Sequence, residues 1–364
     1  MNMRAVHSQT IRSKKLGLQK GISLVELMIS ITIGLILMTG VVQLFLSSRA
    51  TFSTQQALSR VQESGRLAME FLSEDIRMAG YMGCMSRNLN FTNTLNNATD
   101  LAYNFEIGIE GLNDVGATVP AGYPANIVQG TDVLVVRGGT GNGVDVVAVN
   151  NNSKVFIEDT GVTESCGSGL DSFSGLCERD ILVVSDCSKA RVFQVSDLAE
   201  ESGVGVSVEH LDAGTSPGNA ANTWGGGSIP DENFGDDAEV IEMNTTVYYI
   251  SLGVSGQPGL WQETNGANPM ELLEGVENMQ LTYGRDTSGD GIPDSYVDAS
   301  ALTTSADWEQ VASVRVQLLV QSTEDNLLQE AQPYTFNGVT NSAPADRRLR
   351  QVFINTVGIR SRLP

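Results

Sequence analysis

One carboxylate lies inside a long apolar segment near the N-terminus. From Ile22 to Leu46 the chain runs for 25 residues in which Glu26 carries the only charge. A carboxylate in a bilayer costs roughly 2.5–3.5 kcal/mol on insertion scales, so such an acid needs a partner. One reading is that a neighbouring helix or the membrane interface satisfies Glu26 in an ordinary anchor. The other is that the acid has a role in assembly.

An aspartate-rich segment further along could bind a hard cation. In "RDTSGDGIPDSYVDA" the oxygen donors fall at the odd positions of a calcium loop, and Gly291 is placed for a sharp turn. These donors are Asp286, Ser288, Asp290, the Ile292 carbonyl and Asp294. However, Val297 stands where an EF-hand supplies its bidentate glutamate, and no flanking helices are predicted. A hairpin loop without an ion is the alternative. The sequence requires no cofactor, and calcium is the one that it suggests.

The four cysteines could form disulfides or bind zinc. An even count in an oxidising compartment favours disulfides, and four cysteines allow three pairings. Cys166 and Cys177 bracket a short Gly/Ser loop, so we pair them, which leaves Cys84 with Cys187. The zinc alternative has little support, because the sequence has no C-x-x-C and its histidines, His7 and His210, fall in the leader and a loop.

The sequence offers no catalytic constellation. The segment "VVRGGTGNG", residues 135–143, imitates a phosphate loop, but its spacing is not G-x-G-x-x-G and a β pattern follows it. We predict a turn there. There is no G-x-S-x-G, H-E-x-x-H or Walker sequence. We therefore expect that the protein is not an enzyme.

One long helix is predicted to hold Glu26. The 25-residue apolar segment would span roughly 37 Å as a helix, more than a hydrocarbon core of about 30 Å. Beyond it an apolar stripe recurs every three or four residues, which predicts continuation to about Ala79 with the stripe against a sheet. The stripe is Leu58, Val61, Gly65, Ala68, Leu72 and Ile76. Gly80 and Gly83 should end the helix. A coiled coil is the alternative, but the stripe lasts under three heptads.

After Cys84 the pattern changes to short apolar runs separated by Gly, Asn and Asp, which predicts strands. These runs are residues 131–139, 144–149, 154–159, 180–186, 190–195, 245–253, 279–284, 311–322 and 351–361. Residues 85–126 and 211–238 are polar and are predicted surface loops. The fold class is therefore α+β, a lollipop with a long N-terminal helix on a large antiparallel β-rich head.

Charge predicts the topology. The first 20 residues carry five basic residues and no acid, whereas the remainder has 17 basic and 43 acidic residues. The positive-inside rule keeps this leader cytoplasmic and places the C-terminal body outside a single-pass inner-membrane helix. A secretory signal fits poorly, because the apolar core is too long and no A-x-A-like site follows. A body with this excess of acidic residues repels phosphate backbones, and we therefore do not expect direct binding to nucleic acid.

The stretch "KGISLVEL", residues 20–27, resembles the type III signal of type IV prepilins. The resemblance implies that prepilin peptidase cuts between Gly21 and Ile22 and N-methylates Ile22. The new amine, four residues from Glu26, would then pair with that carboxylate in the same or a neighbouring subunit. The implied divisions are a leader (1–21), a transmembrane and assembly helix (22–46), its amphipathic continuation (47–80) and an extracytoplasmic head (81–364).

Further segments resemble the PilW family of minor pilins: "QESGRLAMEFLSEDIRMAGYMGC", "YGRDTSGDGIPDSY", "WEQVASVRVQLLVQS" and "RQVFINTVGIRSR". The resemblance implies a structural subunit of the priming or tip complex of a type IV pilus, which supports motility and adhesion. Its partners would be other minor pilins and the major pilin, through the N-terminal helix, and a tip adhesin. The alternatives are a J-like minor pseudopilin of type II secretion and, from another class, a membrane-anchored periplasmic enzyme.

Overall fold

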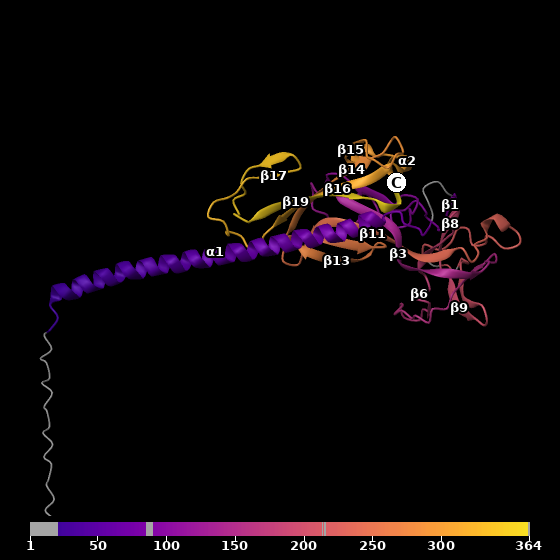
Figure 1. Cartoon of the computed structure of the whole chain (residues 1–364), viewed down its shortest axis with the longest axis horizontal. Helices are drawn as coiled ribbons and strands as arrows, with labels where there is room; N and C mark the ends of the chain where they lie inside the picture. Colours follow the sequence, from indigo (N-terminus) through magenta and orange to yellow (C-terminus); the bar gives the residue numbers. More distant parts are fainter. Residues whose placement is uncertain (1–20, 85–89, 213, 215, 363–364) are drawn as a thin grey trace, which may run out of the picture. The chain divides into compact units, whose positions relative to one another are not determined.

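The computed structural model describes residues 21–84, 90–212, 214 and 216–362 (Figure 1). The predicted leader, apart from Gly21, lies outside these residues. The described residues divide into two units, the first ending at Ser53 and the second beginning at Thr54. Helix α1, Leu24–Met78, begins in the first unit, and the second unit holds the rest of α1 and the strands. The predicted α+β class and the single long helix are confirmed.

The second part of α1 packs against the β-rich head through the predicted stripe, with one correction. Val61, Gly65, Ala68, Leu72 and Ile76 are buried as predicted, but the stripe starts at Ala57 rather than Leu58. Ala57 is 4% exposed, whereas Leu58 is 38% exposed. Residues 57 and 61 are four apart and lie one above the other on a helix, so the small alanine faces the head and the larger leucine turns outward.

The larger sheet of the head is mixed and has eleven strands within the described residues. Its main order is β1-β8-β7-β11-β3-β4-β10-β9, with β2 beside β3 and with β12 and β13 following β11. The strands are β1 (Asn90–Asn93), β2 (Ile109–Leu112), β3 (Val133–Ala148), β4 (Lys154–Ile157), β7 (Ile181–Ser185), β8 (Lys189–Gln194), β9 (Asp197–Glu201), β10 (Gly205–Glu209), β11 (Glu239–Leu252), β12 (Pro258–Thr264) and β13 (Ala267–Glu274).

A second sheet has the order β15-β14-β16-β19 and is antiparallel throughout. Its strands are β14 (Val276–Arg285), β15 (Ser295–Val297), β16 (Val311–Gln321) and β19 (Arg350–Gly358). The other strands form two hairpins, β5 (Ser172–Phe173) with β6 (Leu176–Cys177) and β17 (Tyr334–Phe336) with β18 (Val339–Asn341). The short helix α2 (Ser305–Glu309) precedes β16.

The main core lies where α1 meets both sheets. Leu72 and Ile76 of the helix pack in one cluster with Tyr248 of β11 and Val316 of β16. On β16 the side chains of one face enter this core: Val314, Val316, Leu318 and Val320 are fully buried. Helix and both sheets therefore share one hydrophobic core.

The glycine-rich segment 135–143 is not the predicted turn. It belongs to β3, which continues through it with a register shift against β11. The reason is the end of α1, which lies directly against this strand. Gly80 N–H donates to the Arg137 carbonyl (2.7 Å), and a Cβ on Gly138 would approach the Met78 carbonyl to 2.8 Å. Glycine occurs here because two backbones meet.

The two segments that were predicted as surface loops are partly buried or form strands. Residues 85–126 contain the described strands β1 and β2, and residues 211–238 bring Trp224 and Phe234 into the core, each 1% exposed. His210, predicted in a loop, is also fully buried and stacks on Trp224 with ring centroids 4.1 Å apart. The two aromatic residues were the sequence signal for a buried segment, and the polar composition around them concealed it.

Candidate assembly site in the N-terminal helix

Glu26 lies in the first turn of α1. Ser23 Oγ accepts a hydrogen bond from the Glu26 backbone N–H (3.2 Å), so the serine caps the helix start. An acid here also faces the positive end of the helix dipole. Within the described part of the chain, no hydrogen bond or ion pair reaches the Glu26 carboxylate. The carboxylate is thus available to a group from outside these residues.

The side chains around Glu26 are suited to lipid or to other apolar helices. Ile22 is 71% exposed and Leu24 is 74% exposed, and every residue from 21 to 52 is exposed. The hydroxyls of Ser30 and Thr39 donate to carbonyls four residues earlier, at 2.7 and 2.8 Å. The helix itself therefore satisfies these polar groups, as an apolar surrounding requires. By length and composition α1 can cross a membrane.

Both disulfides have the predicted pairing. Cys84 is joined to Cys187, and Cys166 is joined to Cys177. The first bond fixes the segment after α1 to the β7–β8 turn, and the second closes the β5–β6 hairpin segment. Because all four cysteines are bonded, none is available as a thiolate ligand, so the zinc alternative loses its ligands.

The aspartate-rich segment forms the loop of the β14–β15 hairpin. The Asp286 carboxylate accepts hydrogen bonds from the N–H groups of Gly289 (2.6 Å) and Gly291 (2.8 Å), and Asp294 accepts from Thr287 N–H (2.8 Å). Burial raises the pKa of Asp286, but these hydrogen bonds outweigh it and lower the pKa below its usual value.

The remaining candidate ligands also lie in this loop. Asp290 accepts from Ile292 N–H (2.9 Å), and Ser288 Oγ donates to Asp286 at 3.2 Å. Among the described residues no three His, Cys, Asp or Glu side chains form a metal-binding group. Calcium binding by this loop, which would also need the serine and the Ile292 carbonyl, stays a prediction.

The structure also forms a groove that the sequence did not reveal. It lies between α1 and strand β19, has a volume of about 1280 Å³ and contains residues that are almost 300 positions apart in the chain. Its lining is Arg66, Met69, Glu70, Ser73, Glu74, Arg77 and Met78 from α1, and Phe353, Ile354, Asn355, Gly358 and Arg360 from β19 and the segment after it. No local pattern could predict this juxtaposition.

Comparison with known families agrees with this architecture. The family described as type IV pilus-assembly protein W matches residues 247–361, which contain β12 to β19 and thus the whole second sheet. The prokaryotic N-terminal methylation motif matches residues 17–42, around Gly21, Ile22 and Glu26. Searches of curated proteins and of solved structures find no match.

The two matches cover the N-terminal helix and the C-terminal part of the head. The methylation motif together with the long apolar helix supports anchoring in a membrane. Both families are structural components of the pilus rather than enzymes. The second sheet, on which α1 packs, carries the pilus-assembly sequence. Together the two matches support a minor pilin of the type IV pilus of the PilW family.

Proposed function

We propose that this minor pilin is a structural subunit of the complex that primes pilus assembly and remains at the fibre tip, where it supports motility and adhesion. Prepilin peptidase would cut between Gly21 and Ile22 and methylate the Ile22 amine. The basic leader would stay in the cytoplasm and the head would lie outside the inner membrane. The disulfides suit that oxidising side of the membrane.

The carboxylate of Glu26 carries this proposal. It is the one charge in the apolar segment, and it has no partner within the described residues. Cleavage creates an amine one helical turn away, and a methylated secondary amine keeps its positive charge. Pairing of the Ile22 amine with Glu26 of the same or a neighbouring subunit would remove the cost of an unpaired acid in lipid, and so favour entry into the helix bundle of the fibre.

The test replaces Glu26 in the producing cells. Glu26→Ala removes the charge but keeps the apolar segment, so membrane insertion should be unchanged while pilus number and motility fall to the level of a deletion strain. Glu63→Ala, at an exposed acid on the later part of the same helix, is the matched control and should keep both. Normal piliation of the Glu26→Ala strain would refute the assembly role.

Processing and location need separate measurements. Mass spectrometry of the membrane protein should find Ile22 as the first residue with one added methyl group, and Gly21→Glu should leave the leader in place. Gold-labelled antibodies against the head should mark fibre ends. Labels spread evenly along the shaft would contradict the tip position while leaving the pilin assignment intact.

A further inference from the structure

Strand β19 has one free edge. Within the described residues it pairs only with β16, in nine antiparallel pairs without a register shift. The Ser322 N–H donates to the Leu349 carbonyl, and Ile359 N–H donates to the Ala312 carbonyl. These bonds fix which backbone groups pair, because the N–H and C=O groups of the odd-numbered residues of β19 then point toward β16. The backbone groups of residues 352, 354, 356 and 358 consequently point away from the sheet.

This edge lacks the protection that other edges have. Strand β9 carries Asp197, Glu200 and Glu201, β13 contains Pro269, and β1 and β15 are four and three residues long. Charges, proline and short length are the usual devices against strand pairing. By contrast, residues 351–358 of β19 contain no charged residue and no proline. Ile354 is 63% exposed, and its neighbours Asn355 and Thr356 are exposed too.

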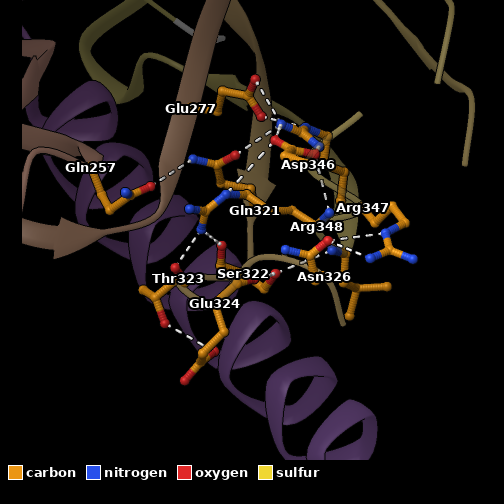
Figure 2. Close-up of polar contacts among 12 residues, drawn as sticks. Gln257, Glu277, Gln321, Ser322, Thr323, Glu324, Asn326, Asp346, Arg347 and Arg348 are labelled. Carbon is orange, nitrogen blue, oxygen red and sulfur yellow. Dashed lines mark hydrogen bonds and ion pairs between the residues drawn. The ribbon is translucent and has the colours of Figure 1, made fainter. Parts of the chain in front are cut away.

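The edge is held in place before anything binds to it. Arg350, at the start of β19, forms ion pairs with Glu277 (2.6 Å) and Asp346 (2.8 Å). Figure 2 shows Glu277, Asp346 and the neighbouring Arg348, which donates to the Ser322 carbonyl at 2.7 Å. The other side of β19 is fixed by β16. A rigid edge spares a ligand the entropy of ordering it.

The groove beside the edge indicates which side chains an added strand should carry. Met69, Met78 and Phe353 offer apolar surface, and Arg66, Arg77 and Arg360 add three exposed cations against two acids, Glu70 and Glu74. This positive balance is unusual in a chain with net charge −21. Residues 347–364 contain five arginines and no acid.

We propose that the outer edge of β19 binds an extended segment of a partner protein by strand addition. The segment pairs with the backbone of residues 352–358, places apolar side chains at alternate positions over the groove, and carries an acidic residue toward its arginines. Main-chain hydrogen bonds supply the affinity, and the groove supplies the selectivity. The proposal concerns β19 and the later part of α1, and it does not depend on where in the fibre the subunit lies.

The experiment uses the purified full chain in detergent and a panel of seven-residue peptides with alternating valine and threonine, ended by glutamate or by lysine. Hydrogen exchange should slow at least tenfold at the amides of Val352, Ile354 and Thr356 when a glutamate-ended peptide is added. Lysine-ended peptides should bind a few-fold more weakly. The same peptides with N-methylated alternate amides keep their side chains and should not protect these positions.

Two variants of Ile354 distinguish binding through the backbone N–H groups of the edge from binding through side chains of the groove. Ile354→Pro removes an outward N–H that the β16 pairing does not use, so the fold should persist while peptide affinity falls at least tenfold. Ile354→Thr is the matched control with the N–H intact. If no peptide of the panel protects the outward amides, or if the N-methylated peptides bind equally well to the unaltered chain, the proposal is wrong. Protection confined to α1 would assign the groove to a helical partner instead.

Discussion

Asp132 is a buried acid whose pKa is raised by burial and lowered by hydrogen bonds. The residue is 1% exposed, and its carboxylate accepts hydrogen bonds from the backbone N–H groups of Asp114 (2.8 Å) and Leu281 (2.7 Å). Burial raises its pKa, the hydrogen bonds lower it, and burial prevails, giving a pKa of about 6. The side chain thus joins the segment just before β3 to β14, but carries its negative charge at a cost.

Asp132 predicts a pH dependence of stability. Because its folded-state pKa is above the unfolded value, its favourable contribution is complete below about pH 4 and is lost as the pH rises through about 6. Relative to Asp132→Asn, the parent should therefore lose up to roughly 3 kcal/mol of unfolding free energy between pH 4 and 7. Urea unfolding of both proteins at several pH values measures this difference. A difference that stays constant with pH would contradict the prediction.

The aspartate-rich β14–β15 loop predicts an effect of calcium. If Asp286, Asp290 and Asp294 bind calcium, titration of calcium chloride into the parent should release or absorb heat, and Asp290→Ala should remove most of it. Asp231→Ala, at an exposed acid elsewhere, controls for general attraction of cations to an acidic chain. Equal heats from the parent and Asp290→Ala would exclude the site.

At the scale of elements, the end of α1 and strand β3 are fitted together by their backbones. Gly139 N–H donates to the Tyr81 carbonyl (2.8 Å), and Gly80 N–H donates to the Arg137 carbonyl. Gly80 has a φ of +69°, the left-handed conformation that commonly ends helices. The helix end is therefore anchored by hydrogen bonds that only a close approach allows.

Gly138→Ala tests this fit. Its Cβ would lie 2.8 Å from the Met78 carbonyl oxygen, a backbone atom that cannot move alone, so the variant should lose about 1–3 kcal/mol of unfolding free energy. Gly116→Ala is the control, because a Cβ there meets no atom within 4 Å. That variant should stay within about 0.5 kcal/mol of the parent or gain slightly. Thermal unfolding compares them, and equal midpoints would argue against close backbone packing.

At the scale of the whole molecule, the two disulfides close very different lengths of chain. Cys84 and Cys187 are 103 residues apart, whereas Cys166 and Cys177 are 11 apart. In the chain-entropy account, a bond stabilises by restricting the unfolded state, and more so for a longer loop. The long bond also links the end of α1 to the large sheet.

Replacing each pair by serine should separate these contributions. Loss of Cys84–Cys187 is expected to lower the unfolding free energy by up to about 4–5 kcal/mol, and loss of Cys166–Cys177 by about 2–3 kcal/mol. Urea unfolding of the two double variants against the parent gives both values. A larger loss from the short bond would show that chain entropy does not govern stability here.

The residues alone indicate the apolar helix with its single acid, its continuation as an amphipathic stripe, and the runs that were predicted as strands. Each of these depends on a local period or on a charge against an apolar background, and both are visible in the residues alone. The same holds for the alternation on β16, where side chains of one face enter the core.

The other features depend on contacts between distant segments. The glycines of residues 135–143 have no side-chain period, so their strand exists because α1 ends against it, and the choice of Ala57 over Leu58 depends on the facing surface. Trp224 and Phe234 are buried by strands that their own polar segment does not predict. The free edge of β19 and its groove arise from α1 and β19, nearly the full chain apart. Contacts between such distant segments leave no trace in local composition.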